Sequence, residues 1–165
     1  MTMADSLDLL NSIRDRVGPD SARTSGLSNE VVARFCKSDD KLIQAINEAV
    51  VAFDSMVEEF GMELLQMEET ELISHLQSGY INFYSAATIN PYIALSACGP
   101  WIITTKGAVI HDNGGYGMLG FGHAPHAAVN AMSQNWVMAN VMTPSFSQLR
   151  LVDRLQSELG HTRGH

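Results

Sequence analysis

A long amphipathic segment between Ser38 and Met67 constrains the fold of this chain more than any other stretch. Its apolar residues recur alternately four and three positions apart in two adjacent rows, at 42, 46, 49, 53, 56 and 60 and at 43, 46, 50, 53, 57, 60, 64 and 67. This spacing predicts a helix of about seven turns with one broad apolar face. Ser38, followed by two aspartates, is the predicted N-cap. So broad a face has to be buried, either by the rest of the chain or by another subunit. A two-stranded coiled coil is disfavoured because the rows lack regular flanking charge pairs.

Three shorter helices are predicted around this segment. Residues 4–17 and 29–37 carry apolar stripes at helical spacing, with Ser28 as the N-cap of the second. The stripes are Leu7, Leu10, Ile13 and Val17 in the first helix, and Val31, Val32 and Phe35 in the second. Residues 70–77 form the last short helix before Ser78 and Gly79. These helices are small, so part of the long apolar face could still meet another subunit.

Charge is distributed unevenly along the 165 residues, whose formal net charge is −8. Between Lys41 and Lys106 there is no lysine or arginine, but eight acids: Glu48, Asp54, Glu58, Glu59, Glu63, Glu68, Glu69 and Glu71. A solvated helix face explains these acids better than a cation site or a site for a basic partner. The acidic balance also argues against a nucleic-acid partner.

Other features of the composition predict a soluble, cytoplasmic protein of one domain or part of one. The N-terminus has acids but no basic region, unlike a signal peptide. No apolar run approaches the roughly 18 residues of a membrane helix, so no membrane partner is expected. Cys36 and Cys98 lie far apart without metal-type spacing, which suggests a reducing compartment.

The second half of the chain predicts a small antiparallel sheet and two further helices. Residues 80–100 contain no charge and read as buried irregular chain or an interface arm. The hairpin spans 101–110: two runs rich in β-branched residues flank Lys106-Gly107, a two-residue break. The two helices are expected over 125–138 and 147–159. Their predicted inward residues are Val129, Met132 and Trp136, and Leu151, Leu155 and Leu159, with Ser145 or Ser147 as the cap of the second. The fold class is therefore α+β, with a helical extension over 1–80 and a second region over 81–165.

The residues alone point to no specific chemistry. Five glycines between 114 and 122 include a G-x-G-x-x-G match, but neither a P-loop nor a parallel βαβ unit accompanies them. Pairs of histidines three or four apart (His123 and His126, His161 and His165) could contribute to a zinc site, with His111, Asp112 or His75 as further ligands, but nothing in their spacing requires one. There is no G-x-S-x-G nucleophile elbow.

An ordered set of residues nevertheless resembles the N-terminal signature of class III aminotransferases, which include the ornithine, acetylornithine and 4-aminobutyrate enzymes. The set comprises Gly107-Ala-Val-Ile-His-Asp112, a glycine-rich passage, then Gly122-His123-Ala-Pro125 and an alanine-rich helix with Gln134. One departure is that Pro125 follows His123 by two positions rather than three. The resemblance covers residues 100–159 and leaves 1–80 unexplained.

The resemblance implies part of a fold-type-I enzyme, which is α/β when complete. It implies pyridoxal 5'-phosphate, held by a lysine as a Schiff base, and amino transfer between an amino acid or amine donor and a 2-oxo acid. It also implies a homodimer or higher homo-oligomer. Tyr116 corresponds to a substrate-contacting aromatic residue of the family, whereas Asp112 and His123 correspond to structural positions, and no residue here is implied as catalytic or cofactor-binding.

The parts of the family pattern that would hold the cofactor are not among these residues. Lys37, Lys41 and Lys106 are the only lysines, and all three are expected to be solvated. The expectation is therefore an N-terminal portion of an aminotransferase, cut before its phosphate-binding loop and inactive alone. The alternative is a stand-alone helical module for oligomerisation or protein interaction, without catalysis.

Overall fold

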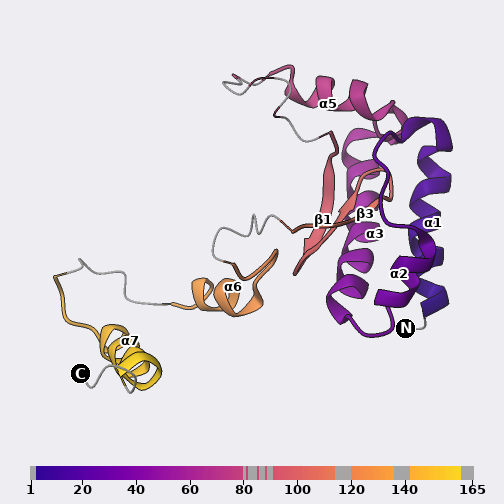
Figure 1. Ribbon diagram of the computed structural model, residues 1–165. Helices are drawn as coiled ribbons and strands as arrows, with labels where there is room; N and C mark the ends of the chain where they lie inside the picture. The colour runs from indigo at the N-terminus through magenta and orange to yellow at the C-terminus, as the bar shows by residue number, and fades with distance from the viewer. Residues whose placement is uncertain are drawn as a thin grey trace. The chain divides into compact units, whose positions relative to one another are not determined.

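The computed structural model describes residues 3–79, 81, 85, 88, 91–113, 120–135 and 142–160 (Figure 1). It divides into two compact units, Met1–Val129 and Asn130–His165, and each is described by itself. The described residues form α-helices and a three-stranded antiparallel sheet, which confirms the predicted α+β class. None of the described helices combines the length and the apolar character needed to cross a membrane.

The first unit begins with two helices that match the predicted ones. α1 spans Met3–Val17 and α2 spans Asn29–Phe35, with a 3-10 turn over Pro19–Ser21 between them. The Ser28 side chain accepts a hydrogen bond from the backbone N–H of Val31, as expected of an N-cap. The apolar stripe of α1 is buried at Leu10, Ile13 and Val17.

The long amphipathic segment is divided between two helices, so the prediction of one continuous helix was wrong. α3 spans Asp40–Phe60 and α4 spans Met62–Gln66. Gly61, between them, has a φ of 85°, which glycine tolerates and which ends a right-handed helix. The N-cap is Asp39 rather than Ser38, because the Asp39 carboxylate accepts a hydrogen bond from the backbone N–H of Lys41.

The apolar face of α3 is buried mainly within its own chain. α3 lies between the sheet and α1 (Figure 1). The first of its two apolar rows is fully buried over its first half, at Leu42, Ile46, Ala49 and Phe53. Burial ends before the helix does, since the Phe60 side chain is 54% exposed. α5 follows at Glu69–Gln77, close to the predicted 70–77.

Three strands form the sheet in the order β1–β2–β3: Ala94–Cys98, Trp101–Thr104 and Val109–His111. The β2–β3 hairpin confirms the prediction, with Ile102 opposite Ile110 and Ile103 opposite Val109. Its turn has three residues rather than two, because Thr104 N–H still donates to the Ala108 carbonyl. Gly107 takes a φ of 71° at the last turn position, the usual geometry for a three-residue hairpin loop.

The predicted C-terminal helices are present but shorter. α6 spans His126–Met132 and α7 spans Phe146–Leu155, followed by a π-helical turn over Gln156–Gly160. Ser145 is the N-cap of α7 and forms a capping box with Gln148. The predicted inward residues are exposed instead: Val129, Met132, Leu151, Leu155 and Leu159. An amphipathic pattern identifies the apolar face of a helix but not the surface that covers it. Trp136 lies outside the described residues.

Candidate functional site

Asp112 and His123 lie together at the open end of the β2–β3 hairpin. His123 Nε2 lies 3.0 Å from Asp112 Oδ2, and both side chains are mostly buried. Asp112 directly follows β3, and its backbone N–H donates to the Pro100 carbonyl at 2.7 Å. The structure thus brings together two residues that are 11 positions apart and that belong to the family signature described above.

A short backbone bridge fixes His123 from the other side. Gly99 and His123 exchange both of their backbone hydrogen bonds, at 2.9 and 2.8 Å. The neighbouring Gly122 has a φ of 75°, and a Cβ there would lie 2.8 to 2.9 Å from backbone atoms of Gly99. Two backbones can approach this closely only if residue 122 has no side chain. Gly122 is therefore required for the close approach of these two backbones.

Trp101 connects this end of the hairpin to the start of α3. Its indole Nε1–H donates to Asp39 Oδ2 at 2.8 Å, while Asp39 also caps α3. The ring is fully buried and meets Phe35 and His111 edge-on, with centroids 5.0 and 4.8 Å away. A buried indole whose N–H is satisfied is a rigid anchor. The position of Asp112 is therefore determined by the core.

A cleft of about 300 Å³ opens beside the Asp112–His123 pair. Its lining includes the side chains of Lys41, Asp112, Asn113 and Phe121, together with the backbone of Gly120 and Gly122. Among the described residues that line it there is no serine, threonine or cysteine. The lining combines the ammonium group of Lys41 with the carboxylate of Asp112, so the cleft suits a small polar molecule. The described part of the cleft can therefore position a small polar molecule.

Tyr116, the one predicted substrate contact, lies outside the described residues, so its role stays a prediction. In sequence it falls between Asn113 and Gly120, both of which line the cleft. Glycines 114, 115 and 117 also lie outside the described residues.

The histidines named as possible zinc ligands have separate surroundings in the described part of the chain. No cluster of three or more His, Cys, Asp or Glu side chains is found there. His123 faces Asp112, whereas His126 contacts the Gln44 amide, so these two histidines have different partners. His161 and His165 lie outside the described residues. Cys36 and Cys98 are both buried and free.

Lys106 lies at the closed end of the same hairpin and is buried, which corrects the prediction of a solvated lysine. It is 3% exposed, and its Nζ donates to the carbonyls of Leu65, at 2.6 Å, and Met67. These carbonyls end α4, so the ammonium caps the negative end of that helix. Burial lowers the pKa of Lys106, and the nearby Glu69 and Glu68 carboxylates partly oppose this shift.

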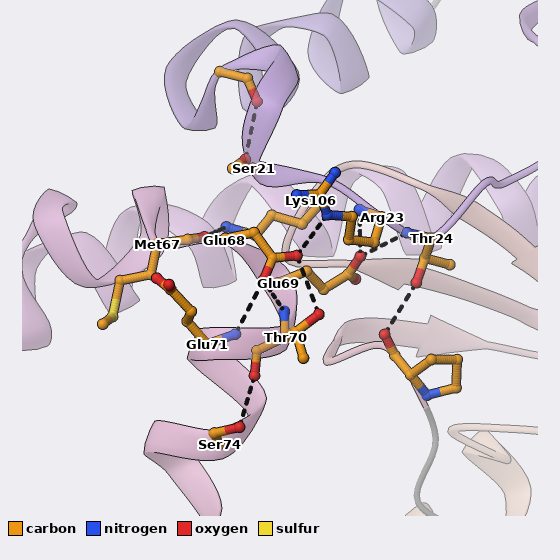
Figure 2. Close-up of polar contacts among 12 residues, drawn as sticks. Ser21, Arg23, Thr24, Met67, Glu68, Glu69, Thr70, Glu71, Ser74 and Lys106 are labelled. Carbon is orange, nitrogen blue, oxygen red and sulfur yellow. Dashed lines mark hydrogen bonds and ion pairs between the residues drawn. The ribbon is translucent and has the colours of Figure 1, made fainter. Parts of the chain in front are cut away.

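Glu69 is also buried, so the prediction of a solvated acidic face was wrong at this position. Glu69 Oε2 accepts hydrogen bonds from the backbone N–H groups of Arg23 and Thr24, at 2.8 and 2.6 Å (Figure 2). Glu68 instead pairs with the Arg23 side chain at 2.8 Å and caps α5 through Thr70 and Glu71. Together with Lys106, the two acids join the loop after α1, the α4–α5 junction and the hairpin turn.

The described lysines do not fit the role of a cofactor-binding lysine. Lys37 and Lys41 are exposed, whereas such a lysine works in a desolvated pocket. Lys106 is desolvated, but its Nζ is held by two backbone carbonyls and its place in the fold is structural. Pyridoxal phosphate therefore has no attachment point among the described residues.

Neither Lys106 nor Glu69 was identified as a site residue from the sequence. The available signal was weak: a single lysine between two runs of apolar residues, and a pair of glutamates just before a helix.

Comparison with models of known protein families, with curated proteins and with solved structures found no match.

Proposed function

We propose that this chain is the N-terminal portion of a pyridoxal-phosphate-dependent aminotransferase of the class III type. The complete enzyme would move an amino group between an amino acid or amine donor and a 2-oxo acid, in the cytoplasm and as a homodimer or higher homo-oligomer. The observation that carries the proposal is the contact between Asp112 and His123. These two signature residues, drawn from either side of the glycine-rich passage, meet beside a cleft of substrate size.

In this proposal the 165 residues hold and orient the substrate, and residues elsewhere in the complete enzyme carry out the amino transfer. The hairpin, anchored by Trp101, fixes Asp112, and the Gly99–His123 bridge fixes the far end of the passage. Tyr116, within that passage, contacts the amino donor. Pyridoxal phosphate, when bound, supplies the electron sink for the transfer. Its lysine lies outside Lys37, Lys41 and Lys106, so the 165 residues alone do not transfer amino groups.

Kinetics of Tyr116 variants test this proposal in the protein translated from the complete reading frame. Tyr116→Ala should raise KM for the amino donor, leave KM for the 2-oxo acid less affected, and leave the melting temperature nearly unchanged. Tyr116→Phe keeps the ring and is the matched control. Absence of amino transfer with every donor, or unchanged kinetics in Tyr116→Ala, contradicts the proposal.

A second candidate, a helical module for oligomerisation or protein interaction, is favoured by the second unit. α7 is well capped, yet its apolar side chains at Leu149, Val152 and Leu155 are all exposed. Exposed apolar residues repeating along one helix are typical of an interface.

Light scattering of the 165-residue chain tests this second candidate. Leu155→Lys should abolish any association, whereas Arg154→Lys should not. A monomer at all concentrations, without amino transfer in the complete protein, would contradict both candidates.

A further inference from the structure

Another cleft of about 300 Å³ lies at the closed end of the β2–β3 hairpin, between the loop after α1 and the hairpin turn. Its lining includes Arg14 near the end of α1, Pro19 and Ala22 in the following loop, and Ala108 just before β3. Arg14 and Lys106 are the ionisable residues in the described lining, which contains no aspartate or glutamate. A cleft whose charged lining residues are all positive attracts anions.

The hairpin turn and two asparagines hold the Arg14 side chain in place. Its Nε–H donates to the Gly107 carbonyl at 3.0 Å, and its Nη1 donates to Asn11 Oδ1 and Asn29 Oδ1 at 3.1 and 2.7 Å. A Cβ at Gly107 would lie 2.7 Å from Arg14 Cγ, so the arginine side chain passes directly over this glycine. All these acceptors are uncharged, so they orient the guanidinium without neutralising it.

One nitrogen of this guanidinium is left free to bind a ligand. Arg14 Nη2 has no hydrogen-bond partner in the described structure, and it is not one of the buried side-chain atoms there that lack a partner. Arg14 also makes no ion pair with a described residue, whereas Arg16 on the same helix pairs with Asp54 at 2.6 Å. Burial lowers the pKa of Arg14. The group is therefore a fixed, partly desolvated cation without a counter-ion in the described part of the chain.

The surroundings of the two cations restrict the charge and shape of the ligand. The Lys106 ammonium is held by two carbonyls at the end of α4, and two glutamates lie near it. The free positive charge is therefore that of Arg14, which matches a ligand with one negative charge. Val17, Pro19 and Ala22 contribute apolar surface to the lining, so a short aliphatic body suits the rest of the cleft.

We propose that this cleft binds a small aliphatic monocarboxylate, whose carboxylate accepts a charge-assisted hydrogen bond from Arg14 Nη2. The aliphatic body lies against Pro19 and Ala22. The site is separate from the cleft at Asp112, so the inference does not depend on the proposed aminotransferase function.

Titration of the 165-residue chain with butyrate and butyramide at neutral pH tests the site. Binding is followed by NMR at the backbone amides of Gly18, Gly26 and Gly107, which all line the cleft. The two probes have nearly the same shape and differ in charge. Wild type should bind butyrate about tenfold more tightly than butyramide, as expected of a hydrogen bond to a charged group. Arg14→Gln should reduce that ratio to about one, whereas the control Arg16→Gln should leave it unchanged.

Two variants at Ala22 test the site with Arg14 still in place. Ala22→Asp adds a carboxylate to the cleft and should abolish butyrate binding, whereas Ala22→Asn, which has the same shape without the charge, should retain it. The proposal is overturned if neither probe binds wild type, if both bind equally, or if Arg14→Gln keeps the preference for butyrate. Equal butyrate binding by the two Ala22 variants would also overturn it. So would inorganic phosphate that binds at the same amides more tightly than butyrate, because the site would then select a dianion.

Discussion

The two ends of the β2–β3 hairpin carry similar residue types but differ in what surrounds them. At the closed end, Lys106 is buried and its Nζ is held by carbonyls of another segment. At the open end, Asp112 and His123 pair beside a cleft that a small molecule can enter. A cleft of about 300 Å³ adjoins each end, so the two ends differ in how their charged groups are held and not in access. The closed end joins segments that are distant in sequence, and the open end pairs Asp112 with His123. Charged residues beside glycine do not by themselves distinguish the two ends, whereas the partners of the charged groups do.

The largest expected effect concerns close packing at the open end. Gly122→Ala should lower the free energy of unfolding by roughly 3 kcal/mol, because a Cβ there meets the Gly99 backbone and φ is positive. Gly120 has a similar φ of 71° but nothing within 4 Å of its Cβ position. Gly120→Ala should therefore cost only about 1 to 2 kcal/mol. Equal losses in urea denaturation would mean that backbone strain, not close packing, explains both glycines.

The next effect concerns the closed end. Lys106→Met should lower the free energy of unfolding by roughly 2 kcal/mol, because the carbonyls of Leu65 and Met67 lose their buried donor. Lys37→Met, at an exposed lysine, is the matched control and should change stability by less than about 0.5 kcal/mol. If Lys106→Met were as stable as wild type, the ammonium would not be stabilising this junction.

The pH dependence of the stabilities of wild type and Lys106→Met provides a second test of the role of Lys106. Burial lowers the native pKa of Lys106 below its ordinary value. Between that lowered pKa and the unfolded value of about 10.4, the unfolded chain binds more protons at this residue. The free energy of unfolding of wild type, relative to Lys106→Met, should therefore rise with pH across this window. A difference that falls with pH would mean that Glu68 and Glu69 outweigh burial.

The smallest expected effect is at the Asp112–His123 pair. Asp112→Asn keeps the shape of the side chain but removes the charge, and should lower the free energy of unfolding by about 0.5 to 1 kcal/mol. Asn113→Asp at the neighbouring exposed position is the control for charge alone. Unchanged stability of Asp112→Asn in urea denaturation would mean that the contact does not stabilise this end of the hairpin.

Local patterns were sufficient to predict the hairpin and most helices of the first unit. β-branched residues on both sides of Lys106-Gly107 identified the strands, and Ser28 identified the start of α2. The extra turn residue, Thr105, was missed because the length of the turn depends on whether Thr104 still pairs with Ala108. Gly61 was visible in the sequence, but one glycine within a long apolar pattern is often tolerated in a helix.

The roles of Lys106 and Glu69 could not be predicted from local sequence, since their partners are distant. The carbonyls that bind Lys106 are 41 and 39 residues away, and the N–H groups that bind Glu69 are 46 and 45 residues away. A charged residue is buried only where the tertiary structure supplies such partners. The contact between Asp112 and His123 was likewise not predicted from spacing, although the resemblance identified both residues as structural.

Borohydride reduction tests the central claim most directly. The protein from the complete reading frame is reduced in the presence of pyridoxal phosphate and then analysed by peptide mapping. The account predicts a pyridoxyl group on a lysine other than Lys37, Lys41 and Lys106. A pyridoxyl group on Lys106 would show that the closed end of the hairpin, and not a site beyond these residues, carries the chemistry. No pyridoxyl group on any lysine would contradict the aminotransferase proposal.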